Sequence, residues 1–200
     1  MNSIPAMIDV NAFFGKSSTG DSEFPEIKDR LAFMDRLGIS KSLVWNTESR
    51  QNHSLSSNQK MIDEIARTPN AKGRIIPALT VSGLIHYERN GIQTLRRQMI
   101  AGETRALRFV NASKRLTLCQ LEPVIRGISV LKPFIVMRWD ESSTQDILEF
   151  TAMLPQISVV LTEVMWGPCL TVFDLMRRRK NILVDNSWLH SYGSVEQAVE

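Results

Sequence analysis

A repeating alternation of short apolar segments and amphipathic segments constrains this chain most strongly. Seven segments are rich in apolar and β-branched side chains, and their starts lie roughly 25 to 35 residues apart. Short apolar runs of this kind are typical of strands buried on both faces of a parallel sheet, and the spacing accommodates a crossover helix between strands. The predicted strands are 6–10, 42–45, 74–79, 106–110, 134–137, 158–161 and 181–184.

The segments between these strands have the periodicity and the end signals of helices. In 25–38, apolar residues recur at three- and four-residue steps, and Gly38 suits the left-handed position after a helix end. Ser143-x-x-Asp146 has the form of a capping box, and Pro155 ends the helix that it starts. The apolar stripe predicted to face the sheet consists of Ile27, Leu31, Met34 and Leu37.

Strands that alternate with helices predict an α/β fold of the TIM (β/α)₈ type. A closed barrel of this kind typically needs about 250 residues, whereas this chain has 200. Ser194-x-x-Gln197 predicts a helix start only a few residues before Glu200. We therefore expect a single domain over 1–200 that is truncated after the seventh strand. Its open strand edges would favour pairing with a second copy of the chain.

Composition excludes several classes of partner. The 24 Lys and Arg residues nearly balance the 21 Asp and Glu residues, and the formal net charge is +3. This gives no electrostatic reason to expect a nucleic-acid or membrane partner. The basic run 177–180 is interpreted as a solvated helix end, with an anion-binding patch as the alternative.

Cofactor and compartment signals are also absent from the sequence. No glycine-rich phosphate loop of the nucleotide- or dinucleotide-binding type occurs. Cys119 and Cys169 lack any metal-binding spacing and are predicted to be reduced thiols. Because the N-terminal residues lack a signal pattern, we expect a cytoplasmic protein.

The first predicted strand resembles that of the amidohydrolase superfamily, in its amidohydrolase-related branch. Residues 7–15 read Met-Ile-Asp-Val-Asn-Ala-Phe-Phe-Gly, where that family has Ile-Asp-x-His-x-His-x-Gly. Segments 31–45, 74–79, 159–167 and 181–187 are similar to later strands and the first helix of the family. The resemblance implies a TIM barrel that hydrolyses small molecules with a divalent metal such as zinc.

The sequence departs from the family at each metal-ligand position that it contains. The two first-strand histidines correspond to Asn11 and Phe13, the fifth-strand ligand to Met137 or Arg138, and the sixth-strand ligand to Glu163. Phenylalanine and methionine are unsuited to a divalent cation of this kind, and an asparagine oxygen is a weak ligand. We therefore predict a degenerate metal site with no metal bound and no cofactor.

Candidate functional residues follow the predicted strands, because active sites of TIM barrels lie at the carboxyl ends of the strands. A carboxylate or imidazole there can act as general acid or base, and two arginines can clamp a planar anion. For Glu163 the alternative is a structural ion pair with Arg138 or Arg108. The predicted catalytic residues are Glu163, Asp185 and His190, and the predicted substrate-binding residues are Asn11, Arg108, Arg138, Trp139 and Trp166.

Two functions are compatible with these residues. The first is hydrolysis of a small polar or carboxylate-bearing substrate by an amidohydrolase-like barrel. The alternative is a catalytically silent barrel that binds a small ligand or a protein partner, since a fold does not dictate a function.

Overall fold

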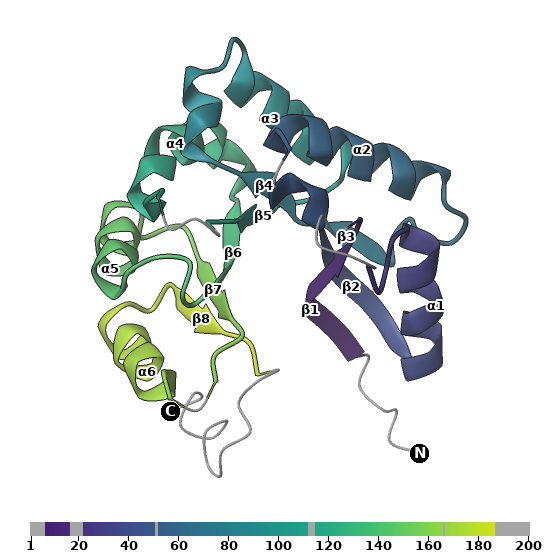
Figure 1. The fold of residues 1–200 in the computed structure, drawn as a ribbon. Helices are drawn as coiled ribbons and strands as arrows, with labels where there is room; N and C mark the ends of the chain where they lie inside the picture. The colour runs from purple at the N-terminus through teal and green to yellow at the C-terminus, as the bar shows by residue number, and fades with distance from the viewer. Residues whose placement is uncertain (1–6, 17–21, 51, 112–114, 166, 187–200) are drawn as a thin grey trace. The chain divides into compact units, whose positions relative to one another are not determined.

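The computed structural model describes residues 7–16, 22–50, 52–111, 115–165 and 167–186 (Figure 1). The chain forms two compact units, the first from 1–80 and 93–104 and the second from 81–92 and 105–200. The described strands form a three-stranded sheet and a five-stranded sheet.

The first unit contains a parallel sheet in the order β1-β2-β3. Its elements are β1 (Met7–Phe14), α1 (Ile27–Leu37), β2 (Ile39–Asn46), the 3₁₀ helix η1 (Thr47–Arg50), α2 (Ser54–Arg67), β3 (Ile75–Pro77) and most of α3 (Gly91–Ala101). Ile27 and Met34 of α1 and Val44 of β2 are completely buried. This helix therefore packs its apolar stripe inward as its periodicity predicts.

Both ends of α1 are stabilised by its own sequence. Glu26 and Asp29 form a reciprocal capping box, and Gly38 adopts the left-handed conformation with φ of 70°. Leu37, which was predicted to share the buried stripe, is 48% exposed because it lies in the last turn beside that cap.

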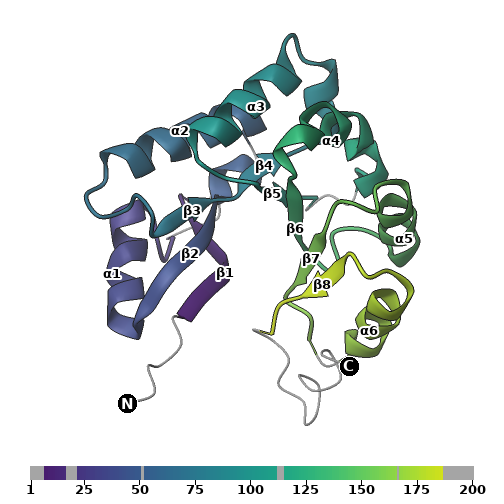
Figure 2. The ribbon, with the colours of Figure 1, turned by 180° about the vertical axis from the view of Figure 1, so that it is seen from behind.

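The second unit is built on the sheet with order β4-β5-β6-β7-β8. In both views, α5 and α6 lie on the same side of β6, β7 and β8 (Figures 1 and 2). Its strands are β4 (Leu79–Val81), where the chain passes from one unit to the other, β5 (Ala106–Phe109), β6 (Phe134–Arg138), β7 (Val159–Thr162) and β8 (Ile182–Val184). Its helices are η2 (Gly83–Tyr87), η3 (Leu118–Leu121), α4 (Glu122–Ile128), η4 (Ser129–Leu131), α5 (Thr144–Met153) and α6 (Cys169–Arg178).

All seven predicted strands are confirmed, with three differences in extent. Strand β2 begins at Ile39, three residues before its predicted start at 42. Segment 74–79 contains two strands, because β3 ends at Pro77 and β4 begins at Leu79. A proline has no N–H to donate and so weakens strand pairing at that point. Strand β1 continues beyond its predicted end to Phe14, because Ala12 and Phe14 are buried and pair with β2.

The predicted helix signals are also seen. The side chain of Ser143 accepts a hydrogen bond from the N–H of Asp146 (3.1 Å) and caps α5. The basic run 177–180 lies at the end of α6, which terminates at Arg178. The predicted start of a final helix at Ser194 lies outside the described residues. None of the described helices is long and apolar enough to cross a membrane.

Candidate functional site

The carboxyl ends of β6, β7 and β8 bring charged side chains to one edge of the second unit's sheet. Arg138, the last residue of β6, pairs in register with Thr162, the last residue of β7. Glu163 follows β7 directly. Asp185 follows β8, and its N–H donates to the carbonyl of Leu161 (3.0 Å). Because loops from several strands converge at this edge, it is the candidate functional site.

An arginine held between two carboxylates is the centre of this edge. Nε and Nη2 of Arg138 each lie 3.0 Å from an oxygen of Asp140, and Nε lies 3.4 Å from Oε2 of Glu163. We call these three residues the strand-end cluster. Their side chains are 38%, 29% and 35% exposed for Arg138, Asp140 and Glu163, respectively, so solvent and small molecules reach them.

The strand-end cluster keeps its arginine charged. Burial lowers the pKa of Arg138, but the carboxylates of Glu163 and Asp140 outweigh burial and raise that pKa overall. The two carboxylate oxygens of Asp140 accept hydrogen bonds from Nε and Nη2 on one edge of the planar guanidinium. This geometry fixes the orientation of the guanidinium. A fixed guanidinium can bind a carboxylate or stabilise negative charge that develops on a carbonyl oxygen.

The backbone of Glu163 is in an unusual conformation. Its φ is 59°, in the left-handed region that a non-glycine residue seldom adopts. Such conformations cost free energy and persist where the surroundings enforce them, often at functional sites. Here the conformation comes directly after β7, at the position where the side chain meets Arg138.

Arg108 lies in β5 and forms a separate, buried ion pair. Its Nη1 is 3.3 Å from Oε2 of Glu141, and the two side chains are only 1% and 7% exposed. The carboxylate of Glu141 also accepts hydrogen bonds from the N–H groups of Arg138 (2.9 Å) and Asn111 (3.4 Å). The two arginines predicted to clamp one anion therefore each bind a different carboxylate of the chain. Of the two partners considered for Glu163, the structure shows the ion pair with Arg138.

The other predicted site residues have different positions. Trp139 is half-buried, and its backbone N–H donates to the carbonyl of Thr162 (3.1 Å). Asp185 is buried. Asn11 belongs to the first unit, where it lies inside β1 and its N–H donates to the carboxylate of Asp9 (3.0 Å). Trp166 and His190 lie outside the described residues.

Two of the residues that the resemblance places at metal-ligand positions lie among apolar neighbours in this structure. The ring of Phe13 packs edge-to-face against Phe24, with centroids 5.8 Å apart. Met137 is fully buried in the core, and the neighbouring Arg138 is itself a cation. Among the described residues, no group of three or more His, Cys, Asp or Glu side chains has the arrangement of a metal site.

Sequence reasoning missed the polar residues that support this edge. Asn111 binds the loop after β5 to the loop after β6, because its side-chain amide donates to the carbonyls of Leu116 (2.6 Å) and Glu141 (2.8 Å). The carboxylate of Asp146 accepts from the N–H groups of Leu118 (2.5 Å) and Cys119 (3.1 Å) at the start of η3. The capping-box spacing identified Asp146, but no local pattern predicted its hydrogen bonds to the distant N–H groups of Leu118 and Cys119.

Burial and the neighbouring Asp146 disfavour ionisation of the thiol of Cys119. Burial, the hydrogen bond to Asp146 and the negative charge of that residue raise the pKa of Cys119 from 9.0 to about 12. The reactive thiolate is then about a thousandfold scarcer than in the unfolded chain. We expect iodoacetamide at pH 8 to alkylate Cys119 far more slowly in the native protein than in urea. Asp146→Asn should accelerate the native reaction at least about tenfold.

The control for this measurement is Asp174→Asn on the exposed side of α6, which should leave the rate at Cys119 unchanged. Peptide mass spectrometry separates Cys119 from the buried Cys169. Equal rates for Cys119 in the native and unfolded states would contradict the assignment.

The fold and this edge define an α/β protein with parallel sheets and a charged cluster at the strand ends. No protein-family model matches the sequence, and no curated protein matches it. Solved structures do match, and they include TIM-barrel and amidohydrolase proteins. At 10% to 12% identity, the likeness shows the TIM-barrel type of fold and nothing finer.

Three of these structures illustrate the likeness. An uncharacterised TIM-barrel protein from Bordetella bronchiseptica has a TM-score of 0.63 at 10% identity, over 90% of this chain and 74% of its own. A probable 2-pyrone-4,6-dicarboxylic acid hydrolase from Acinetobacter baumannii, with citric acid bound, has a TM-score of 0.54 at 11% identity, over 96% and 89%. An amidohydrolase from Mycobacterium avium subsp. paratuberculosis has a TM-score of 0.51 at 12% identity, over 81% and 58%.

Proposed function

We propose that this protein is an amidohydrolase-like hydrolase that acts on a small, carboxylate-bearing substrate at the strand-end cluster. The observation that carries the proposal is the ion pair of Arg138 with Glu163, accessible to solvent and placed at the carboxyl ends of adjacent parallel strands. The unusual backbone conformation of Glu163 supports a functional role for this residue.

In the proposed reaction, Arg138 binds the substrate and Glu163 acts as the general base. Glu163 takes a proton from water as the water oxygen attacks the substrate carbonyl, and the guanidinium of Arg138 stabilises the resulting oxyanion. The tetrahedral intermediate then expels its leaving group, which takes the proton back from Glu163. Asp140 is the positioning residue that orients Arg138.

The remaining predicted site residues have proposed roles around this pair. Trp139 and Trp166 would wall the site and exclude water, and Asp185 and His190 would supply further acid or base groups. One of the similar structures is a probable dicarboxylic acid hydrolase with citric acid bound, and this similarity supports a carboxylate-bearing substrate. No step is assigned to a metal, because Phe13, Met137 and Arg138 do not suit one.

A second function, ligand binding without catalysis, is favoured by one specific observation. Arg138 and Arg108 are already paired with carboxylates of the chain itself. Such pairs are typical of structural ion networks. In that case a small ligand would bind at this edge without being turned over.

Hydrolysis by the metal-stripped full chain tests the proposal. The panel contains lactones and esters that carry a separate free carboxylate, each beside an uncharged counterpart with a methyl group in place of that carboxylate. Proton release is followed with an indicator dye. We expect turnover of at least one carboxylate-bearing compound and preference for it over its counterpart, because the cationic Arg138 binds the carboxylate.

Three results would contradict this proposal. Turnover that requires added zinc or manganese would contradict the metal-independent reaction. Preference for the uncharged counterparts would contradict the role of Arg138. Absence of turnover with and without metal would contradict hydrolysis, and saturable nuclear magnetic resonance shifts at residues 138–141 and 163 would then establish the binding function.

A further inference from the structure

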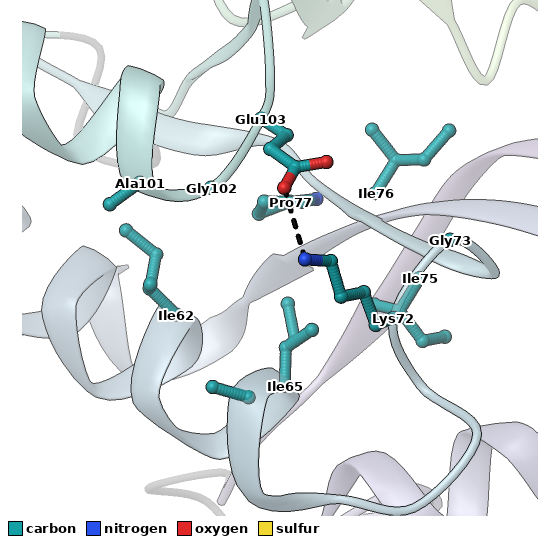
Figure 3. A pocket seen from close by; sticks show the side chains of 11 residues that line it. Ile62, Ile65, Lys72, Gly73, Ile75, Ile76, Pro77, Ala101, Gly102 and Glu103 are labelled. Carbon is teal, nitrogen blue, oxygen red and sulfur yellow. Dashed lines mark ion pairs between the residues drawn. The ribbon is translucent and has the colours of Figure 1, made fainter.

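A cavity lies in the first unit, beside β3. Ile62 and Ile65 of α2 form one wall, and Ile75 and Pro77 of β3 form another. Figure 3 shows Ile62 and Ile65 pointing from the helix toward the space beneath the side chains of Lys72 and Glu103. The walls of the cavity are therefore aliphatic.

Small residues at the rim keep this cavity open. Ala66, Gly73, Ala101 and Gly102 line it without side chains that would fill it. At Gly102 a Cβ would lie 3.0 Å from Cγ of Pro77 and 3.2 Å from the carbonyl oxygen of Gln98, so a side chain there would be in tight contact with both groups. The cavity volume is about 180 Å³. An apolar cavity of roughly 150 Å³ in a protein is known to hold benzene.

One ion pair crosses the opening of the cavity. Nζ of Lys72 lies 3.2 Å from Oε1 of Glu103, and Figure 3 shows this contact between the loops before β3 and after α3. The two side chains are 82% and 72% exposed. An ion pair this exposed contributes little to stability, so both groups can exchange partners at low cost.

We propose that this cavity binds a small zwitterion with an apolar body, of the class of the aliphatic and aromatic α-amino acids. The apolar side chain would occupy the space against Ile62, Ile65 and Ile75. The ligand's carboxylate would pair with Lys72 and its ammonium group with Glu103. The proposal is independent of any hydrolysis at the strand-end cluster.

The two opposite charges at the opening decide the charge of the ligand. A simple anion would pair with Lys72 but would lie beside the carboxylate of Glu103, and a simple cation would meet the reverse repulsion. A neutral apolar molecule would gain burial but neither ion pair. A zwitterion alone replaces one internal ion pair with two ion pairs to the ligand.

Titration of the full chain with four matched probes tests the proposal. The probes are L-phenylalanine, phenylacetate, phenethylamine and toluene, followed by ¹H–¹⁵N nuclear magnetic resonance, with L-alanine as the control that lacks an apolar body. We expect L-phenylalanine to bind about fivefold more tightly than each of the other three aromatic probes. Its shifts should concentrate at residues 62–66, 72–77 and 101–103.

Variants at exposed positions complete the test. Ala66→Trp places a ring at the cavity rim and should abolish binding, whereas Ala32→Trp, at an exposed alanine of α1, should leave binding unchanged. Lys72→Met and Glu103→Gln should each weaken L-phenylalanine binding about fivefold while leaving toluene binding unchanged.

The proposal is overturned if L-phenylalanine causes no shifts at the cavity residues, or if it binds no better than the singly charged and neutral probes. It is also overturned if Lys72→Met and Glu103→Gln leave the affinity for L-phenylalanine intact. These two surface variants remain informative if Ala66→Trp disturbs the helix.

Discussion

Arg108→Met should lower the free energy of unfolding by about 3 to 5 kcal/mol. The guanidinium of Arg108 and the carboxylate of Glu141 are both almost completely buried and lie 3.3 Å apart. Methionine fills most of the volume of the arginine but leaves the buried Glu141 carboxylate without its ion-pair partner, and removing one partner of a buried pair is strongly destabilising. Urea denaturation followed by circular dichroism measures this loss.

Two further variants separate the buried pair from a general effect of losing an arginine. Arg178→Met removes an ion pair with Asp174 in which both side chains are more than half exposed, and it should cost less than about 1 kcal/mol. The double variant Arg108→Met with Glu141→Gln should recover part of the loss, because it removes the buried charge as well. If Arg108→Met lowers the free energy of unfolding as little as Arg178→Met does, the ion pair of Arg108 with Glu141 is not desolvated.

Glu163→Gln should reduce turnover of the best substrate by about 10²- to 10⁴-fold while the protein stays folded. Glutamine keeps the size of the side chain but cannot accept the proton of the attacking water. The measurement is kcat and KM on the compound that the panel identifies. Glu149→Gln, at an exposed carboxylate of α5, is the matched control and should retain full activity.

Stability separates a catalytic role of Glu163 from a structural one. The left-handed conformation at this position is strained for glutamate and unstrained for glycine, so Glu163→Gly should raise the free energy of unfolding by about 1 kcal/mol even though it removes the ion pair with Arg138. A variant that is more stable but inactive indicates a residue retained for function. Unchanged turnover in Glu163→Gln would remove this residue from the mechanism.

Periodicity and end signals predicted the regular elements well because those signals are local. The strand between 74 and 79 is the exception, since its division at Pro77 depends on which sheet each half joins. Leu37 follows the apolar stripe of α1 in sequence but lies in the final turn, where the helix leaves the core.

Side-chain partners at the strand ends were only partly predictable. Arg138 ends β6 and Glu163 directly follows the neighbouring strand β7, as the order of a parallel sheet predicts, so their ion pair was one of the expected alternatives. The direction of Arg108 was open, because strand alternation gives two choices and the partner Glu141 lies in a loop. Asn111 and Asp146 were missed for the same reason, since their partners are backbone groups of distant loops.

The amount of metal bound to active protein distinguishes metal-independent from metal-assisted hydrolysis. The chain is purified without a histidine tag, equilibrated with zinc and with manganese, desalted, and analysed by elemental mass spectrometry beside the turnover assay. If Glu163 and Arg138 act without a metal, the protein binds far less than one ion per chain and its turnover does not change with added metal. One zinc or manganese ion per chain, with turnover that rises in proportion, would contradict the metal-independent reaction and would restore a metal-assisted hydrolysis.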